Sequence, residues 1–151
     1  MKPAPFDPAA LPAGAWRTTR PVRFADCDPA GIVFFPRYFE MLNGVVEEWF
    51  SAALGLDYAA FIGPRRTGLG PAHAEADFFR PGRHGDVLDF AVLVPRIGGS
   101  SVALEIPVTR GTEPVFVGRL SIVTTSLEAH RAVPLPPDLR AALARYREGC
   151  R

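Results

Sequence analysis

Apolar residues recur every three or four positions along residues 35–53, which is the clearest periodic pattern in the chain. The positions that share one side of this segment are Phe35, Phe39, Leu42, Val46, Trp49 and Ala53. The opposite side carries Glu40, Asn43, Glu47 and Ser51. This spacing matches the turn of an α-helix and predicts an amphipathic helix whose apolar stripe faces a core. Pro36 suits the first turn of that helix, and Gly55 suits its end.

Most of the remaining chain has the shorter period of extended strands. We expect one strand before the helix, at 18–24, and four after it, at 72–79, 86–95, 100–110 and 115–126. The joints RPGRHGD, RIGGSS and RGTEP have the composition of tight turns, so successive strands should pair as antiparallel hairpins. A second helix is predicted at 137–147.

This order of elements predicts an α+β domain in which a five-stranded antiparallel sheet wraps around a long central helix. Apolar residues on the outer face of that sheet would favour pairing with a second copy of the chain. Residues 1–17 contain four prolines, one glycine and no continuous apolar run, and we expect a flexible tail there. Residues 18–151 should form the single domain.

Composition excludes several classes of protein. The chain has 151 residues with 17 basic and 16 acidic side chains, so no strong field attracts nucleic acid or an anionic membrane. No apolar run approaches the length of a membrane span. Cys27 and Cys150 lie far apart and outside any metal-binding spacing. We therefore expect a cytoplasmic protein with no cofactor, no metal, no nucleic-acid partner and no membrane partner.

Three stretches resemble one known family. The segment FADCDPAGIVFFPRYFEM is similar to the signature of the 4-hydroxybenzoyl-CoA thioesterase family, a hotdog-fold family of acyl-CoA thioesterases. GPAHAEADFFRPGRHGDVLDF and GGSSVALEIPV resemble later blocks in the family's order, so the resemblance covers about 20–126. The matched positions in the first block are Asp26, Asp28, Gly31, Ile32 and Val33.

The resemblance implies a hotdog fold and an acyl-CoA thioesterase, a thioester hydrolase. It also implies homodimers that join two sheets edge to edge, active sites at the dimer interface and a homotetramer built from two dimers. The catalytic carboxylate of the family corresponds to Asp28. The backbone N–H that polarises the thioester carbonyl corresponds to Phe35. We expect substrate contacts from Gly31, Ile32, Val33, Phe34 and His73.

The chemistry of thioester hydrolysis fits these residues. A helix N-terminus carries a partial positive charge and free N–H groups, which stabilise an oxygen as it becomes an oxyanion. Gly31 tolerates a positive φ, so the segment between Asp28 and Phe35 can fold back and bring the carboxylate near the helix start. Asp28 could then attack the carbonyl to give a mixed anhydride, or deprotonate the water that attacks instead.

Other polar residues have simpler interpretations. We interpret Asp26 as structural and Cys27 as a bystander, because no histidine is near it in sequence. His73 either reaches the ligand or packs in the core or an interface, and we assign no site role to His84 or His130. Glu47 and Glu48 are interpreted as polar-face residues of the central helix. Five arginines are candidates for the phosphates of coenzyme A, although most should be ordinary surface charges: Arg65, Arg66, Arg80, Arg83 and Arg96.

The predicted substrate is a short or aromatic acyl-CoA, such as a benzoyl or hydroxybenzoyl ester. Gly98, Gly99 and Ser100 stand where some relatives have basic residues before the third block. A carrier-protein-bound acyl group therefore remains an alternative. A second alternative is a non-catalytic module that binds or senses acyl-CoA. A hotdog hydratase ranks last, because its histidine motif with an acidic partner has no counterpart that we can locate in this sequence.

Overall fold

The predicted central helix is present as α1 (Pro36–Ala52) in the computed structural model, which describes residues 2–151. Its buried side chains form an apolar stripe as predicted, although only some of them are the predicted residues: Tyr38, Leu42, Val45, Val46, Trp49 and Phe50. The prediction is wrong for Phe35, whose side chain is 58% exposed. Phe35 is the N-cap residue, so the helix begins after it and Tyr38, one turn later, takes its place in the core.

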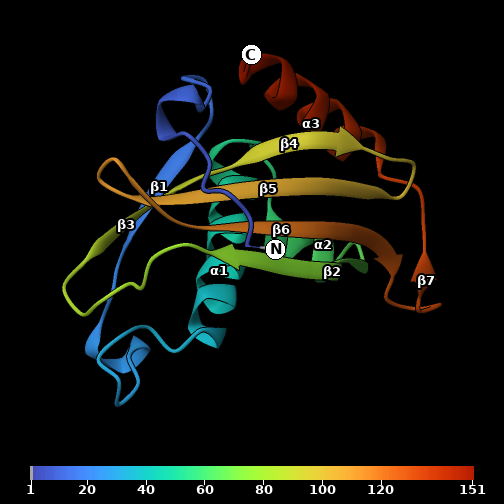
Figure 1. Cartoon of the computed structure of the whole chain (residues 1–151). Helices are drawn as coiled ribbons and strands as arrows, with labels where there is room; N and C mark the ends of the chain where they lie inside the picture. Colours follow the sequence, from blue (N-terminus) through green and yellow to red (C-terminus); the bar gives the residue numbers. More distant parts are fainter. Residues whose placement is uncertain (1) are drawn as a thin grey trace.

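A single antiparallel sheet lies against α1, with strand order β1-β3-β5-β6-β2 (Figure 1). Two further strands extend it, because β4 pairs with β5 and β7 pairs with β6. The strands are β1 (Arg17–Pro21), β2 (Thr67–Phe78), β3 (Val87–Ala91), β4 (Leu93–Ile97), β5 (Ser101–Arg110), β6 (Glu113–Ser126) and β7 (Arg131–Ala132). The predicted fold class, a curled antiparallel sheet around a long helix, is confirmed, although the sheet formed by residues 2–151 has seven strands rather than five.

Strand boundaries differ from the predictions for identifiable reasons. The strand expected at 86–95 is divided into β3 and β4 at Val92, whose N–H donates to Trp16 O. β2 begins at Thr67, five residues before the strand predicted at 72–79. Gly68 permits this pairing with β6, since a Cβ there would lie 2.3 Å from Thr125 Oγ1. β1 ends at Pro21, and the chain then forms a 3-10 turn, η2 (Phe24–Asp26).

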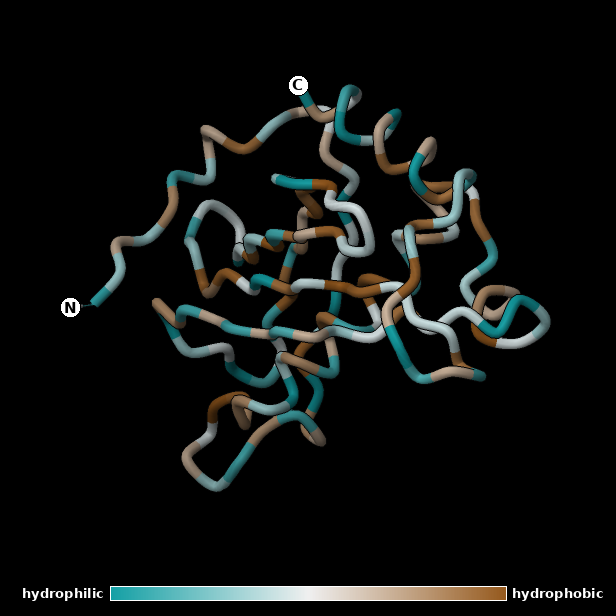
Figure 2. The backbone as a smooth tube through the Cα atoms, turned by 90° about the vertical axis from the view of Figure 1, so that its right-hand side faces the viewer, coloured by the Kyte–Doolittle hydropathy of each residue, from teal (hydrophilic) through white to brown (hydrophobic). Residues whose placement is uncertain are grey.

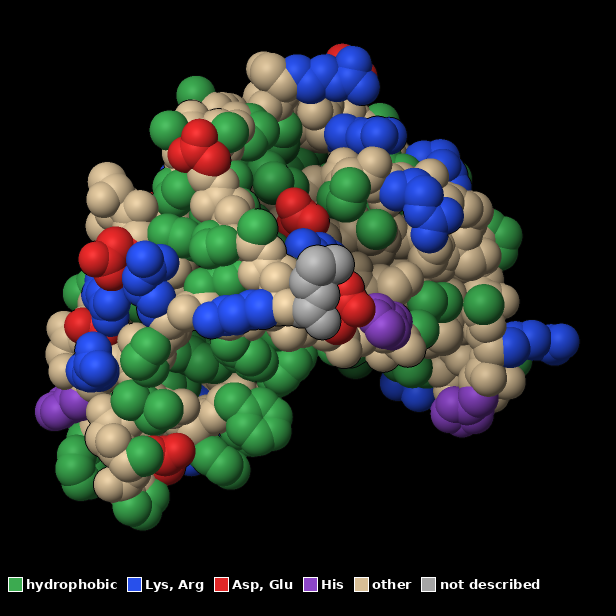
Figure 3. Space-filling view, in the orientation of Figure 1, with side chains coloured by type: hydrophobic (Ala, Val, Ile, Leu, Met, Phe, Trp, Pro, Cys, Tyr) green, Lys and Arg blue, Asp and Glu red, His purple; other side chains and the backbone are tan. Residues whose placement is uncertain are grey.

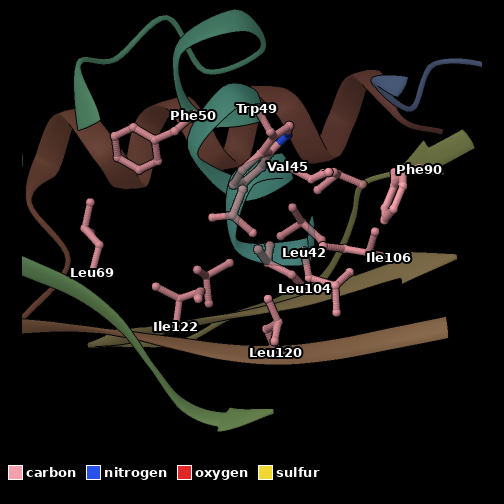
Figure 4. Close-up of a cluster of buried hydrophobic side chains, with 14 of the residues drawn as sticks. Leu42, Val45, Trp49, Phe50, Leu69, Phe90, Leu104, Ile106, Leu120 and Ile122 are labelled. Atoms are coloured by element: carbon pink, nitrogen blue, oxygen red, sulfur yellow. The ribbon is translucent and has the colours of Figure 1, made fainter. Parts of the chain in front are cut away.

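The core lies between α1 and the inner face of the sheet (Figure 4). Side chains from α1 meet the inward-facing residues of two long neighbouring strands, β5 and β6. The labelled strand residues in this layer include Leu104, Ile106, Leu120 and Ile122. Fully burying one such aliphatic side chain contributes about 1.5–3 kcal/mol, so this layer fixes the position of α1 on the sheet.

Two shorter helices complete the fold. α2 (Tyr58–Ile62) packs near the start of β2, and α3 (Pro137–Gly149) lies along β4 with Leu139 and Leu143 buried (Figure 1). Among residues 2–151, none of the helices combines the length and the hydrophobicity that a bilayer crossing requires.

The outer face of the sheet is more polar than expected. At its centre Arg119 donates to Asp77 at 2.7 Å and to Glu105 at 3.0 Å. The expectation of an apolar outer face is therefore wrong at this point, because cross-strand ion pairs occupy it. The segment before β1 contains a 3-10 turn, η1 (Pro8–Ala10), and packs Phe6 edge-on against Phe79 with 6.1 Å between ring centroids.

Candidate active site

The segment between η2 and α1 folds back on itself as a tight turn. Cys27 pairs with Val33, and the Asp28 N–H donates to Ile32 O at 2.9 Å. The turn closes where the Gly31 N–H donates to Asp28 O at 2.9 Å, with Gly31 at φ +81°. Glycine adopts this left-handed conformation without the strain that a side chain would cause. The expectation that Gly31 lets the segment fold back agrees with this geometry.

The start of α1 presents one backbone donor. Pro36 has no N–H, while the amides of Arg37 and Tyr38 donate to Phe34 O at 2.8 Å and Phe35 O at 3.1 Å. The Phe35 N–H donates to no other group within residues 2–151. It therefore remains available at the positive end of the helix dipole, where an anionic oxygen is stabilised.

The Asp28 carboxylate is half-buried and can accept further hydrogen bonds. Its Oδ1 accepts the Ala30 N–H at 2.8 Å, which holds the side chain across its own turn. Its Oδ2 accepts no hydrogen bond from the described part of the chain. One oxygen therefore fixes the orientation, while the other is open to a water molecule or an electrophile.

A cavity of about 290 Å³ opens between the start of α1 and the end of β2. Its walls are mostly apolar and aromatic: Ile32, Val33, Phe35, Tyr38, Phe78, Phe79, Arg80 and Pro81. Its volume is near the lower end of the usual range for small-molecule sites. The small cavity of about 20 Å³ beneath α3 has room for no more than about one water molecule and cannot hold an acyl group.

The predicted site residues differ in their relation to this cavity. Ile32, Val33 and Phe35 line it. Asp28 does not line it in the single chain, but its backbone is bonded to Ile32, which does. Gly31 is exposed in the turn beside it.

Phe34 and His73 lie outside the cavity walls. Phe34 is 49% exposed and packs edge-on against Phe35 with 5.9 Å between ring centroids. His73 lies on β2 with its side chain 64% exposed and Nε2 3.2 Å from Glu75 Oε2. The core interpretation of His73 therefore fails in this chain, and its substrate contact stays a prediction.

Exposed aromatic rings surround the turn. Phe24 is 82% exposed and lies edge-on to His84, and Phe34 and Phe35 project nearby. Figure 3 shows hydrophobic side chains gathered on the lobe at the lower left, over the loop between β1 and α1. The hydropathy-coloured backbone in Figure 2 likewise shows brown stretches within the projecting loop at the bottom of the view. Such an apolar surface beside a cavity is typical of a binding site or an interface.

The other acidic candidates have structural partners. Asp26 Oδ2 accepts the Arg23 N–H at 2.8 Å, in agreement with a structural role. Glu48 accepts from Arg20 at 2.6 Å and thereby ties α1 to β1. Within the described residues, no group of three or more histidine, cysteine or carboxylate side chains could hold a metal ion.

The five candidate arginines fall into three groups. Arg65 is bound by Asp138 at 2.7 Å and Arg66 by Glu128 at 2.8 Å, so both are already neutralised. Arg80 lines the cavity and lies 3.8 Å from Glu113. The two remaining arginines, Arg83 and Arg96, are exposed and form no ion pair with any part of the chain that the structure describes.

A buried hydrogen bond and a partly buried ion pair support the site from behind. Burial raises the pKa of Tyr38 above the ordinary tyrosine value, so its hydroxyl is neutral where it accepts the Gly82 N–H at 3.0 Å. Partial burial of Asp86 acts to raise its pKa, but the Arg83 N–H and the Arg110 guanidinium, 2.7 Å away, outweigh it and lower the pKa. The loop after β2 is thus anchored to β5.

Sequence reasoning missed Tyr38, Phe78 and Gly82. The position of Tyr38, one helical turn after Phe35, could have suggested a place beside the same opening. Phe78 follows the alternation of β2 and was assigned to a strand without a role. Gly82 was interpreted only as a turn former in RPGRHGD, and nothing local indicates that it contacts α1.

Comparison with protein families and curated proteins gives a consistent result. Residues 22–143 match the model of the thioesterase-like superfamily. A 1,4-dihydroxy-2-naphthoyl-CoA hydrolase from Synechococcus elongatus is 27% identical over 122 residues, covering 80% of this chain and 89% of the relative. A hydrolase of the same name from another Synechococcus strain is 30% identical, covering 82% and 86%.

Solved structures share the fold. The 1,4-dihydroxy-2-naphthoyl-CoA thioesterase from Synechocystis superposes with a TM-score of 0.79 at 23% identity, over 86% of this chain and 96% of that one. A gentisyl-coenzyme A thioesterase gives 0.76 at 23% identity, over 85% and 99%. At these identities the likeness establishes the architecture alone.

The Asp86–Arg110 pair generates a pH prediction. Because the folded-state pKa of Asp86 is lowered, its charge stabilises the fold above the ordinary aspartate value of about 4, and this contribution is lost as the pH falls through the lowered value. Asp86→Asn should therefore reduce the free energy of unfolding at pH 7, with a gap to the wild type that narrows below about pH 4. Urea unfolding at a series of pH values measures this gap, and a gap independent of pH would exclude the assigned cause.

Proposed function

The chain belongs to the thioesterase-like superfamily, and from that premise we propose that it hydrolyses the thioester bond of an aromatic acyl-CoA. The observation that carries the proposal is the position of the Asp28 turn just before Phe35. Within residues 2–151 the Phe35 N–H has no hydrogen-bond acceptor, and Phe35 lines a cavity with aromatic walls. The names of the curated relatives, all CoA hydrolases, agree with the predicted thioester hydrolase.

The Phe35 amide acts as the oxyanion donor. The thioester carbonyl oxygen binds at the tip of α1, where the negative charge of the tetrahedral transition state meets the Phe35 N–H and the helix dipole. The donor is fixed before substrate binds, because Pro36 and the bonded amides of the first turn hold the backbone. One such donor is worth about 3 kcal/mol of the barrier.

Asp28 supplies the negative oxygen on the other side of the carbonyl. Its Oδ1 is held by the Ala30 N–H, so Oδ2 is the oxygen that attacks the carbonyl or takes a proton from the attacking water. In both routes the thiolate of coenzyme A leaves, and water finally delivers the hydroxyl of the released acid. Both routes lose their reacting group if Asp28 is changed to asparagine.

The cavity favours a flat acyl group. The rings of Tyr38 and Phe78 lie 5.6 Å apart between centroids, and Phe35 lines the same cavity. Aromatic walls pack well against another aromatic ring. The curated relatives named for a naphthoyl-CoA substrate support the same class of acyl group.

A second copy of the chain completes the proposed enzyme. β2 pairs with β6 along one edge, its other edge has no partner strand within residues 2–151, and 70–75 are exposed. Such a long open edge favours pairing with another strand. Pairing of two β2 edges would bring His73 to the interface, where it could contribute to the partner's site. A homotetramer and a cytoplasmic location remain predictions.

Replacing the reacting carboxylate tests the activity. Asp28→Asn should lower kcat by about 1000-fold or more on the preferred ester, because the reacting oxygen is lost. Thiol release should be followed with benzoyl-, hydroxybenzoyl-, 1,4-dihydroxy-2-naphthoyl-, phenylacetyl- and short aliphatic CoA esters.

The matched control is Asp26→Asn, which changes a structural carboxylate on the same loop and should keep kcat within about tenfold of the wild type. Asp28→Asn turnover within a few fold of the wild type would contradict the role of Asp28. Tight binding of the esters with no thiol release by the wild type would indicate a binding module instead.

The oxyanion donor can be removed without adding a new polar group. Phe35 has φ −53°, which a proline ring accepts, so Phe35→Pro should delete the N–H with little change of backbone. We expect kcat to fall by about 100- to 1000-fold. Phe35→Ala keeps the N–H and should mainly raise KM. Equal kcat values for the two variants, with thermal unfolding showing both to be folded, would mean that another group stabilises the oxyanion.

A further inference from the structure

One residue of the loop between β2 and β3, Gly82, contacts both halves of the proposed site. Its N–H donates to Tyr38 Oη at 3.0 Å, and its carbonyl accepts the Val33 N–H at 2.9 Å. Tyr38 lies in the first turn of α1, with its N–H bonded to Phe35 O at 3.1 Å. Val33 pairs with Cys27 and so closes the turn that carries Asp28. One residue therefore links the carboxylate turn to the helix tip.

This contact is buried and tightly packed. Tyr38 and Val33 are each 4% exposed, and Gly82 is buried with them. A Cβ on Gly82 would lie 2.8 Å from Tyr38 Oη and 3.1 Å from Val33 Cγ2. Gly82 does not have a positive φ, so its backbone would accept alanine. The lack of a side chain is required by the close approach of the two elements and not by the backbone conformation.

The loop that holds Gly82 is itself anchored. Asp86 Oδ2 accepts the Arg83 N–H at 2.8 Å and an Arg110 N–H at 2.7 Å. The same guanidinium donates to Pro81 O at 3.3 Å, and the Val22 N–H donates to Asp86 O at 2.8 Å. These bonds connect the loop to β5 and to the end of β1. Gly82 is therefore held by more than its own contacts with the two elements that it joins, although Arg83 of the same loop also pairs with Ile32 of the carboxylate turn.

We propose that Gly82 and the Tyr38 hydroxyl form a positioning clamp that sets the separation between the Asp28 carboxylate and the Phe35 N–H. The proposal rests on the proposed thioesterase function, because it assigns these residues to the geometry of that site. Gly82 does not line the cavity, and the Tyr38 hydroxyl is engaged with Gly82, so both act through the turn and the helix. A misplacement of about 1 Å in such a site costs about 100-fold in rate.

The two residues can be tested against each other. Tyr38→Phe keeps the ring and should lower kcat by about tenfold with KM changed less than about twofold. Gly82→Ala should lower kcat by about 100-fold, because its Cβ pushes the helix and the turn apart. In the double variant the nearest obstacle, the hydroxyl, is gone and the ring Cζ lies 3.8 Å from the Cβ. The double variant should therefore be more active than Gly82→Ala alone.

Tyr146→Phe is the matched control for loss of a buried tyrosine hydroxyl. Tyr146 Oη donates to Val92 O at 2.6 Å and accepts the Trp16 N–H at 2.9 Å, away from the turn and the start of α1. This variant should lose thermal stability while keeping the wild-type kcat. Comparison with this variant separates the effect of lower stability on kcat from the effect of moving Asp28 relative to the Phe35 N–H.

Hydrogen exchange gives a readout that does not depend on activity. Tyr38→Phe should speed amide exchange across 27–35, and Tyr146→Phe should not. The clamp is overturned if exchange there is unchanged, or if folded Tyr38→Phe and Gly82→Ala both keep the wild-type kcat. A double variant no more active than Gly82→Ala also overturns it. If the wild type releases no thiol from any ester, the proposed function fails. The exchange result alone then shows whether Gly82 and the Tyr38 hydroxyl hold the turn and the helix together.

Discussion

The proposed chemistry of this protein depends on one group, the Phe35 amide at the start of α1. A helix start normally offers several free N–H groups, but here proline removes one and the turn into the helix uses the next two. The remaining donor follows the Asp28 turn in the chain and belongs to a residue that lines a mostly apolar cavity. The local sequence therefore leaves one free N–H, that of Phe35, at the start of α1.

The rest of the fold holds that donor still. The apolar stripe of α1 packs into the curl of the sheet, so the helix cannot shift along or away from it. At its N-terminal end, the Tyr38 hydroxyl and the peptide of Gly82 connect the helix to the loop after β2. The ion pair of Asp86 and Arg110 secures that loop in turn. Core packing therefore fixes the helix as a body, and a few polar contacts fix its tip relative to the carboxylate.

Local features were predictable from the sequence, and long-range contacts were not. The helix, the turn at Gly31 and the hairpin joints RIGGSS and RGTEP depend on the spacing of neighbours, and the structure contains them. The hairpin predicted at RPGRHGD is wrong, because β2 pairs with β6 while β3 pairs with β1 and β5. The start of β2 was missed because Gly68 pairs closely with β6, far along the chain. The exposure of Phe35 was missed because periodicity cannot tell the last residue before a helix from the first within it. The contact of Gly82 with Tyr38 spans 44 residues and leaves no local pattern.

The central claim is that the carboxylate of Asp28 and the amide of Phe35 act on opposite sides of one carbonyl group. The most direct measurement is a crystal structure with a ketone analogue of benzoyl-CoA, in which a methylene group replaces the sulfur. The account predicts a carbonyl oxygen about 3 Å from Phe35 N, with an Asp28 oxygen facing the carbonyl carbon from the other side. A carbonyl oxygen held by other donors, with the Phe35 amide facing water, would contradict it.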